Sequence, residues 1–224
     1  VIIGGGFAGA TAAKYLRMWS PDLEVILIEK KSAFVSCPQS NLVLSGHRTL
    51  QQLTFDYHTL TSHYGVKMIQ ATVNAVDVDK KNVRLSDGSV VDYDRLIVAP
   101  GVDFIYDQLS MLTPEIVETK IPHAWKAGPQ TQLLHEQLKA MPKGGKVVMT
   151  IPQAPFRCPP GPYERACQIA LFLKHHNPTA KLIILDANGD IISKKALFKG
   201  VWDDLYADII EYQPSNAVEN IDVD

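Results

Sequence analysis

The sequence predicts an α/β fold built on two βαβ units, and three observations lead to this prediction. An apolar run at Val1–Ile3 is followed by a glycine turn, a helical pattern and a second apolar run at 25–28. The same order of strand, turn, helix and strand recurs between residues 146 and 186. Between them, alternating residues contain the hairpin signal Asp87-Gly88. We therefore expect two Rossmann-like dinucleotide-binding-type domains with a small antiparallel β meander.

Length and composition set the outer limits of the interpretation. The chain has 224 residues, 46% of them hydrophobic and 21% charged, which suits a soluble globular protein with one large or two small domains. Its formal net charge of −2 gives no sign of a nucleic-acid or anionic-membrane partner. No run of eighteen apolar residues is present, so we predict no membrane span. The chain starts inside a strand and stops at Asp224 before a second domain would be complete, so we expect it to be truncated.

The first glycine turn has the spacing of a phosphate-binding loop. Gly4, Gly6 and Gly9 follow the pattern G-x-G-x-x-G, with Phe7 and Ala8 at the start of the helix that follows. The first glycine allows a tight turn, the second lets backbone approach a pyrophosphate, and the third lets helix and strand pack closely. The helix N-terminus presents free N–H groups to the phosphates. We predict a dinucleotide site here, with a nucleotide-free βαβ unit as the alternative.

An acidic residue at the next strand end supports the dinucleotide site. The apolar run 25–28 ends in Glu29, followed by Lys30, about 20 residues after the glycine turn. At that position an acid holds ribose hydroxyls. Strand, glycine turn, helix, strand and acid in this order predict a dinucleotide site more specifically than the glycines do.

A third strand leads to the same site. Residues 93–101 form an apolar strand that ends in Ala99 and Gly101, and such small residues bring backbone close to a ligand. The segment resembles the second FAD-contact motif of the pyridine-nucleotide-disulfide reductase superfamily, with Pro100 in place of the usual Thr. The resemblance implies that the first ligand is FAD and not NAD.

The remaining elements are expected from apolar periodicity and turn residues. We expect a short helix at 50–64, meander strands from 67 to 91, a connector at 113–128, a helix at 131–141, a strand at 146–151, a helix at 163–175, a strand at 182–185 ending in Asp186, a helix at 194–206 and a strand at 209–212.

The turn of the second unit lacks the features of a nucleotide site. Residues 152–164 contain five prolines and one glycine, with Phe156 where pyrophosphate would need bare backbone. Proline supplies no N–H group, so the anion cradle is lost. The second unit is therefore expected to keep the fold of an NAD domain without its NAD site, and electrons should come from another donor.

The three cysteines are considered one at a time, because an odd number this small does not indicate a disulfide scaffold. Cys158 lies beside Arg157 just before a helix start, and both favour a reactive thiolate; the alternative is a structural cysteine in a surface loop. Glu164 either caps that helix or accepts a proton near the thiol. Cys37 is either a buried thiol or a cofactor contact, and Cys167 is interpreted as a small core residue. The seven histidines show no metal-ligand spacing, so no metal site is predicted.

Two long segments then point to a family. Residues 122–131 and 154–166 closely resemble the flavoprotein subunit of flavocytochrome c sulfide dehydrogenase, and the likeness runs along the chain, including Tyr57. The resemblance implies an FAD-binding domain over residues 1–112 and, over 113–224, an NAD-type second domain without a functional NAD motif.

The resemblance also implies roles for single residues. In this family FAD is joined through its 8α-methyl group to the cysteine of a C-x-x-S-N segment, which Cys37–Asn41 matches. Cys158 matches the first cysteine of a redox-active disulfide over the flavin, and the second is expected beyond residue 224. Glu164 matches an acidic residue near that disulfide.

The implied activity is periplasmic oxidation of sulfide, with electrons passing through FAD to haem c on a cytochrome c subunit. The rival interpretations are a membrane-associated sulfide:quinone oxidoreductase and a non-catalytic FAD module. The proline-rich turn at residues 152–164, called the proline loop below, disfavours an NAD(P)H-dependent reductase.

Overall fold

The computed structural model of the chain describes residues 1–106, 109, 111–123 and 125–222, so the expected break at Asp224 lies outside it. The chain forms two compact units. The first unit contains Val1–Val35 and Thr54–Phe104, and the second contains Ser36–Leu53 and Ile105–Asp224. The segment Ser36–Leu53 therefore belongs to the second unit, although it lies in sequence between two stretches of the first.

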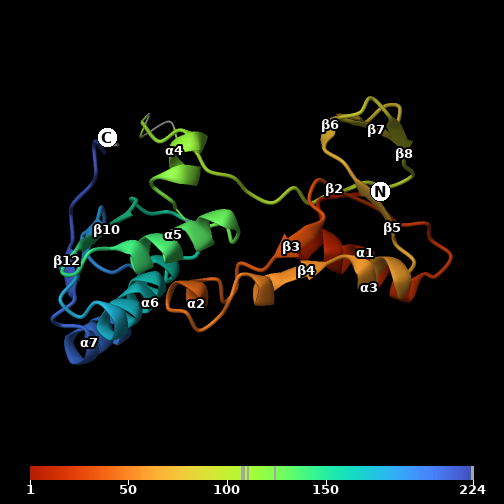
Figure 1. Cartoon of the computed structure of the whole chain (residues 1–224). Helices are drawn as coiled ribbons and strands as arrows, with labels where there is room; N and C mark the ends of the chain where they lie inside the picture. The colour runs from red at the N-terminus through yellow and green to blue at the C-terminus, as the bar shows by residue number, and fades with distance from the viewer. Residues whose placement is uncertain (107–108, 110, 124, 223–224) are drawn as a thin grey trace. The chain divides into compact units, whose positions relative to one another are not determined.

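A parallel sheet forms the centre of the first unit (Figure 1). Its strand order is β5-β2-β1-β9, and helix α1 (Phe7–Trp19) connects β1 to β2. Ile2, Ala13 and Leu27 are almost fully buried between this helix and the sheet. The strand bounds are Ile2–Ile3 for β1, Ile26–Glu29 for β2, Lys67–Gln70 for β5 and Ile97–Val98 for β9.

The predicted meander is confirmed over a shorter stretch. Strands β6 (Val73–Asp77), β7 (Asn82–Leu85) and β8 (Val90–Asp92) pair antiparallel in sequence order. Gly88 has a φ of +87° in the turn between β7 and β8, which glycine adopts readily. The alternation of residues 67–69 predicted that they belong to the meander, and this prediction was wrong: they form part of β5, which pairs parallel with β2. Alternation records a half-buried strand and does not specify its partner.

The helix expected at 50–64 was wrong in its first half. The segment instead forms a 3₁₀ turn (η1, Gln51–Leu53), strand β4 (Thr54–Asp56) and then the short helix α3 (His58–Ser62). Strand β4 pairs antiparallel with β3 (Ala33–Val35), a contact across about twenty residues of sequence. Tertiary pairing of this kind overrides local helical preference.

The second unit repeats the βαβ plan, as expected. Strands β10 (Lys146–Ile151), β11 (Lys181–Asp186) and β12 (Ile210–Gln213) are parallel in the order β10-β11-β12. Helix α6 (Gly161–His176) connects β10 to β11, and α7 (Lys195–Leu205) precedes β12. The other helices of this unit are α2 (Asn41–Leu44), α4 (Pro114–Thr119) and α5 (Pro129–Ala140), and α2 packs against α5 and α6.

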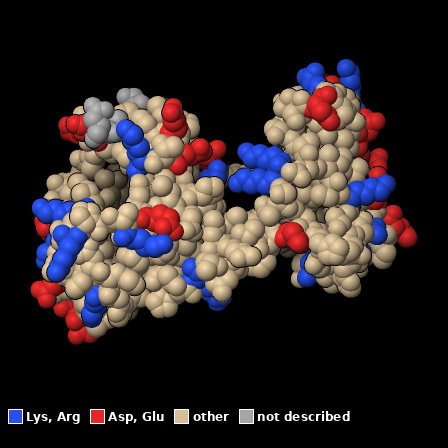
Figure 2. Space-filling view, in the orientation of Figure 1, with Lys and Arg blue, Asp and Glu red and all other residues tan. Residues whose placement is uncertain are grey.

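The core of the second unit lies between its sheet and helices. Tyr163, Leu173, Leu182 and Ile184 have no exposed surface, and Leu44 from α2 joins the same cluster. The mixed parallel and antiparallel α/β architecture confirms the predicted fold class. On the face shown in Figure 2, acidic and basic side chains are interspersed on both units.

Candidate functional site

The glycine turn of the first unit is shaped partly by close backbone contacts. Gly4 has a φ of +96°, and a Cβ added there would lie 2.1 Å from the carbonyl oxygen of Ala99. A Cβ on Gly9 would lie 1.8 Å from the carbonyl oxygen of Gly4. These two glycines are therefore required by the turn and by contact of helix α1 with strand β1.

Gly6 has a different environment from its neighbours. A Cβ added to it would meet nothing within 4 Å, and its φ of −71° is allowed for any residue. The fold itself therefore does not require a glycine here, whereas a phosphate group approaching the N-terminus of α1 does. The cradle fits the pyrophosphate of a dinucleotide. Phe7 and Ala8 follow it as exposed residues in the first turn of α1.

Glu29 supports the glycine turn from the end of β2. Its Oε2 accepts a hydrogen bond from the backbone N–H of Gly5 at 2.7 Å, and its Oε1 accepts one from the N–H of Lys31 at 3.0 Å. The side chain is half-buried, and Lys30 beside it is exposed. The predicted ribose-binding acid therefore lies at the edge of the glycine turn, which is compatible with the expected role.

The segment after β9 reaches the same edge of the sheet. Strand β9 pairs parallel with β1, and the N–H of Ala99 donates to the carbonyl of Ile3 at 2.8 Å. Gly101 is exposed with a φ of +79°, and a Cβ there would meet nothing within 4 Å. The structure thus brings Ala99 beside the glycine turn and leaves Gly101 in open space near the end of β9.

Tyr57 was not identified as a site residue from motif spacing. It is 7% exposed, and its hydroxyl donates to the carbonyl of Gly5 at 3.0 Å. Burial, and next the charge of Glu29, raises the pKa of Tyr57 to about 12. The phenol is therefore neutral at pH 7, and its hydrogen bond to the carbonyl of Gly5 holds the glycine turn in place. The contact spans 52 residues, so no local sequence signal indicates it.

In the second unit, one short segment contacts Cys37 and lies against the helix start beside Cys158. The N–H of Ala127 donates to Cys37 Sγ at 3.5 Å. A Cβ added at Gly161, at the start of α6, would lie 2.6 Å from Cη2 of Trp125 and 3.3 Å from Sγ of Cys158. The backbone at 127 thus holds one sulfur, while the indole at 125 lies against the helix start that the other sulfur contacts.

The loop conformation at Cys158 is unusual. Cys158 is exposed and has a φ of +60°, in the left-handed region that few residues other than glycine adopt. Its carbonyl accepts from the N–H of Gly161 at 2.9 Å, which starts α6 directly after the prolines. Glu164 lies exposed in the first turn of this helix, where a carboxylate suits the helix dipole. Both of its predicted roles, cap and proton acceptor, remain predictions.

Arg165 is a second residue that sequence reasoning missed. It is 8% exposed, its Nε donates to Asn41 Oδ1 at 3.1 Å, and its guanidinium also donates to the carbonyl of His123. The same group lies 5.2 Å from the centre of the Trp125 ring, within cation–π range. Burial lowers the pKa of Arg165 to about 10, which leaves it charged at pH 7. Arg165 therefore links Asn41, in the segment after Cys37, to helix α6. Ala124, which belongs to the segment 122–131 named above, lies outside the described residues.

Cys167 lies away from these contacts on the core side of α6. It is half-buried, and Trp202 Nε1 donates to its sulfur at 3.3 Å. Burial raises the pKa of the Cys167 thiol, which disfavours the reactive thiolate. Within the described part of the chain, no group of three or more His, Cys, Asp or Glu is arranged to hold a metal ion. Over the same residues, no helix is both long enough and apolar enough to span a bilayer.

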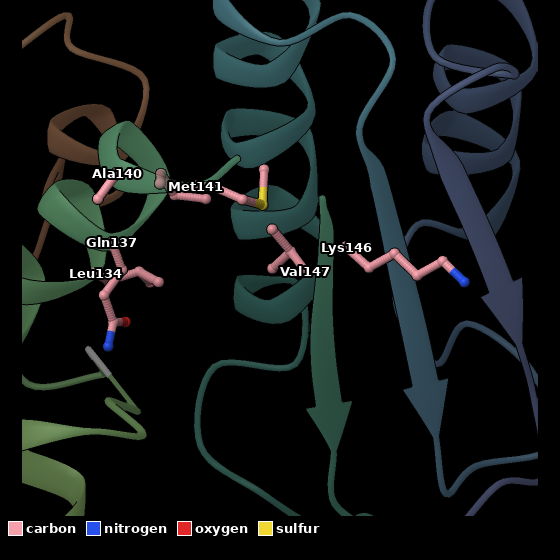
Figure 3. Close-up of a pocket in the computed structure, with 7 residues that line it drawn as sticks. Leu134, Gln137, Ala140, Met141, Lys146 and Val147 are labelled. Atoms are coloured by element: carbon pink, nitrogen blue, oxygen red, sulfur yellow. The ribbon is translucent and has the colours of Figure 1, made fainter. Parts of the chain in front are cut away.

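A separate cavity lies at the amino-terminal end of strand β10 in the second unit (Figure 3). Its volume is about 330 Å³, and side chains from the end of α5 and the start of β10 line it, among them Leu134, Met141 and Val147. The Cys158 loop follows the opposite, carboxyl end of β10. The cavity is therefore not part of the candidate site.

Two family models together match most of the chain. Residues 131–224 match the model described as the central part of the sulfide dehydrogenase [flavocytochrome c] flavoprotein chain. Residues 1–110 match the pyridine nucleotide-disulphide oxidoreductase model.

Individual proteins agree with these models. The chain is 58% identical over 43 residues to the sulfide dehydrogenase [flavocytochrome c] flavoprotein chain of Chlorobaculum thiosulfatiphilum, covering 19% of this chain and 90% of that sequence. It is 25% identical over 199 residues to mitochondrial sulfide:quinone oxidoreductase of Mus musculus, covering 87% of this chain and 43% of that protein.

A solved structure shows the same fold. The sulfide:quinone oxidoreductase of Aquifex aeolicus superposes with a TM-score of 0.77 at 23% identity, covering 99% of this chain and 52% of that one. The chain thus spans about half the length of these two larger relatives.

Proposed function

The chain belongs to the family of the flavocytochrome c sulfide dehydrogenase flavoprotein chain, and from this premise we propose that its protein oxidises sulfide and passes the electrons to a cytochrome c subunit. The family is one of flavin-dependent oxidoreductases. The observation that carries the proposal is the arrangement in the second unit, where residues 125–127 reach both Cys37 and the helix start beside Cys158. One segment thereby lies close to the cysteine that would attach the flavin and to the helix start beside the cysteine that would carry the sulfur chemistry.

The first unit supplies the FAD cradle in this proposal. The open backbone at Gly6 and the N-terminus of α1 would hold the pyrophosphate, and Glu29 would accept hydrogen bonds from the ribose. Cys37 would form the covalent bond to the 8α-methyl group. When bound, FAD supplies an acceptor for two electrons that can leave one at a time for a haem.

Cys158 would carry the sulfur chemistry. In its oxidised form it would be joined to a second cysteine outside residues 1–224. Hydrosulfide attacks this disulfide, a new S–S bond forms to one cysteine as a persulfide, and the other cysteine leaves as a thiolate. Further hydrosulfide removes the outer persulfide sulfur, at oxidation state zero, as a hydrodisulfide ion, which leaves both cysteines as thiols or thiolates. Re-forming the disulfide then releases two electrons, for which bound FAD would supply the acceptor. Glu164 would accept the proton released from hydrosulfide.

The test of this role compares two cysteine variants of the full-length protein with its cytochrome subunit. Sulfide is added anaerobically, and the flavin and haem spectra are followed. Cys158→Ser should keep the yellow flavin and lose sulfide-dependent cytochrome reduction. Cys167→Ser, which alters a half-buried thiol of the same helix region, should turn over normally. Normal turnover in Cys158→Ser would refute the proposal.

Covalent attachment has its own test. Cys37→Ala should convert an acid-resistant flavin into one that acid extracts, detected by flavin fluorescence on a denaturing gel. Flavin that acid already extracts from the parent would show that the covalent link is wrong.

A second candidate function is sulfide:quinone oxidoreduction. It is favoured by the similarity to the mouse mitochondrial enzyme over most of this chain. After sulfide has bleached the flavin, cytochrome c and a water-soluble quinone are offered separately. Faster reoxidation by cytochrome c supports the first proposal, faster reoxidation by quinone supports the second, and a flavin that sulfide does not bleach supports a non-catalytic module. We also propose a periplasmic location, which cell fractionation tests.

A further inference from the structure

A fully buried carboxylate lies at the carboxyl end of β11. Asp186 has no exposed surface. Its Oδ2 accepts hydrogen bonds from the hydroxyls of Tyr163 and Tyr212, each at 2.9 Å. Its Oδ1 accepts from the backbone N–H and the side-chain amide of Asn188, at 2.9 and 2.7 Å. Four donors on one carboxylate offset the cost of removing it from water.

Asp186 holds the same topological position in the second unit as Glu29 in the first. Each ends the second strand of a parallel βαβ unit, where dinucleotide-binding proteins use the acid to hold ribose hydroxyls. In the second unit, two tyrosine hydroxyls of the chain itself occupy the carboxylate. Burial raises the pKa of Tyr163 to about 12 and also raises that of Tyr212, so both hydroxyls are donors at pH 7. Asp186 therefore serves an internal contact and not a nucleotide.

Asn188 extends this network to the start of the proline loop. Its Nδ2 donates to the carbonyl of Pro152 at 3.0 Å, and its Oδ1 accepts from the N–H of Ala154 at 2.9 Å and from Nε2 of Gln153 at 3.1 Å. With the bond to Asp186, these contacts use both amide hydrogens and both acceptor sites of a side chain that is 3% exposed. A loop rich in proline has few backbone donors, so this amide fixes its first residues.

The end of the loop returns to the same carboxylate. Tyr163 lies in the first turn of α6, has no exposed surface, and bonds Asp186 through its hydroxyl. That hydroxyl also accepts from the N–H of Ile192 at 3.2 Å, which fixes its orientation. Cys158 lies between the two anchored ends, in a left-handed conformation that surrounding structure has to maintain.

We infer that Asp186, acting through Asn188 at one end of the loop and Tyr163 at the other, is the positioning residue of Cys158. It determines where the sulfur lies and thereby how readily Cys158 pairs with its partner cysteine. The inference rests on the proposed function in taking Cys158 to form a disulfide. Because a disulfide is favoured when two sulfurs are held at bonding geometry, a loosened loop should favour the dithiol.

Three variants of the full-length protein test this role. Asn188→Ala removes the contact to the start of the loop, and Tyr212→Phe removes one hydroxyl from Asp186 while leaving the loop contacts in place. Asn177→Ala is the matched control. Asn177 is also a buried asparagine, 8% exposed, and its amide bridges two backbone groups in the turn between α5 and β10 at the opposite end of the sheet.

Each protein is equilibrated with mixtures of reduced and oxidised dithiothreitol, which exchanges two electrons and two protons with each disulfide. The thiol form of Cys158 is measured by alkylation and mass spectrometry, and thermal unfolding is recorded in parallel. Asn188→Ala should shift the equilibrium about tenfold toward thiol, equivalent to about 30 mV. Tyr212→Phe should shift it less in the same direction, and Asn177→Ala should lower the melting temperature without a shift.

Equal shifts in Asn188→Ala and Asn177→Ala, or no shift in either, would overturn the inference. If Asn188→Ala does not fold, Tyr212→Phe compared with Asn177→Ala decides in the same way. A parent in which Cys158 stays a thiol in every mixture would instead refute the disulfide of the proposed function. The positioning role is then tested by the alkylation rate of the exposed Cys158 thiol, which loosening of the loop should change about threefold in Asn188→Ala only. Equal rates in Asn188→Ala and the parent would refute it.

Discussion

Two glycines of the same turn should respond differently to one added methyl group: Gly9→Ala should lose stability, and Gly6→Ala should lose FAD affinity. In Gly9→Ala the new Cβ would lie 1.8 Å from the carbonyl oxygen of Gly4, which is 1.6 Å short of the 3.4 Å where ordinary contact begins. The obstructing atom belongs to the backbone, so helix α1 and strand β1 must move apart. Overpacking of this size costs about 3 kcal/mol. For a chain of 224 residues that corresponds to a fall of about 6–12 °C in melting temperature.

Gly6→Ala should leave the fold nearly unchanged and weaken FAD binding. Its Cβ meets nothing within 4 Å of protein, and loss of a glycine N-cap costs about 0.5–1 kcal/mol. The methyl group would, however, occupy the space that the pyrophosphate needs. We expect at least a tenfold loss of affinity, or about 1.4 kcal/mol.

The assay separates the two effects. Both variants are made in a Cys37→Ala background, so that flavin can be removed whether or not the parent links it. Thermal unfolding of the FAD-free proteins and FAD titration by fluorescence quenching are then measured. A Gly6→Ala protein that binds FAD with parental affinity would refute the cradle, and a Gly9→Ala protein that melts within 2 °C of the parent would refute the contact argument.

Three further predictions follow from buried groups. Burial raises the pKa of Tyr57 to about 12, so the stability that its neutral hydroxyl contributes is complete below pH 10 and is lost as the pH rises toward 12. Tyr57→Phe should cost about 1 kcal/mol of unfolding free energy at pH 7 and should remove this part of the alkaline loss. Denaturant titrations at pH 7 and near pH 12 measure both effects. Gly161→Ala should displace the indole of Trp125, because the new Cβ would lie 2.6 Å from it. The tryptophan fluorescence should shift, and the unfolding free energy should fall by about 1–3 kcal/mol. Adding Trp125→Phe to Gly161→Ala should restore part of that loss. Leu182→Ala, at a position without exposed surface, should cost about 2–5 kcal/mol, whereas Leu205→Ala, at 47% exposure, should stay within about 0.5 kcal/mol; similar losses in both would contradict the assigned core.

The sequence-based predictions succeeded where the signal is local. Strand β10 was predicted with its observed bounds, because its apolar run is ended by glycines on one side and by proline on the other. The glycine turn and Glu29 were likewise found from spacing within about thirty residues. Their roles toward FAD stay predictions, as do those of Cys37 and Cys158.

Contacts between distant residues were not predictable in this way. The hydroxyl of Tyr57 contacts a residue 52 positions away, and Arg165 contacts one 124 positions away. In the same way, strand β4 pairs with β3 across the chain, which misled the helical interpretation of residues 50–64. Such pairings depend on which surfaces the fold brings together, and the hydrophobic periodicity of a single sequence does not indicate which residues will be partners.

The assignment of Ser36–Leu53 to the second unit has a consequence for synthesis on the ribosome. Leu44 is fully buried in the completed chain, yet its carbonyl is contacted by His135, which is made 91 residues later. At about 5–20 residues per second, Leu44 waits for roughly 5–18 s before His135 is made. During that interval the nascent chain presents an apolar surface, and chaperone capture at this stage should be strongest between the synthesis of α2 and α5.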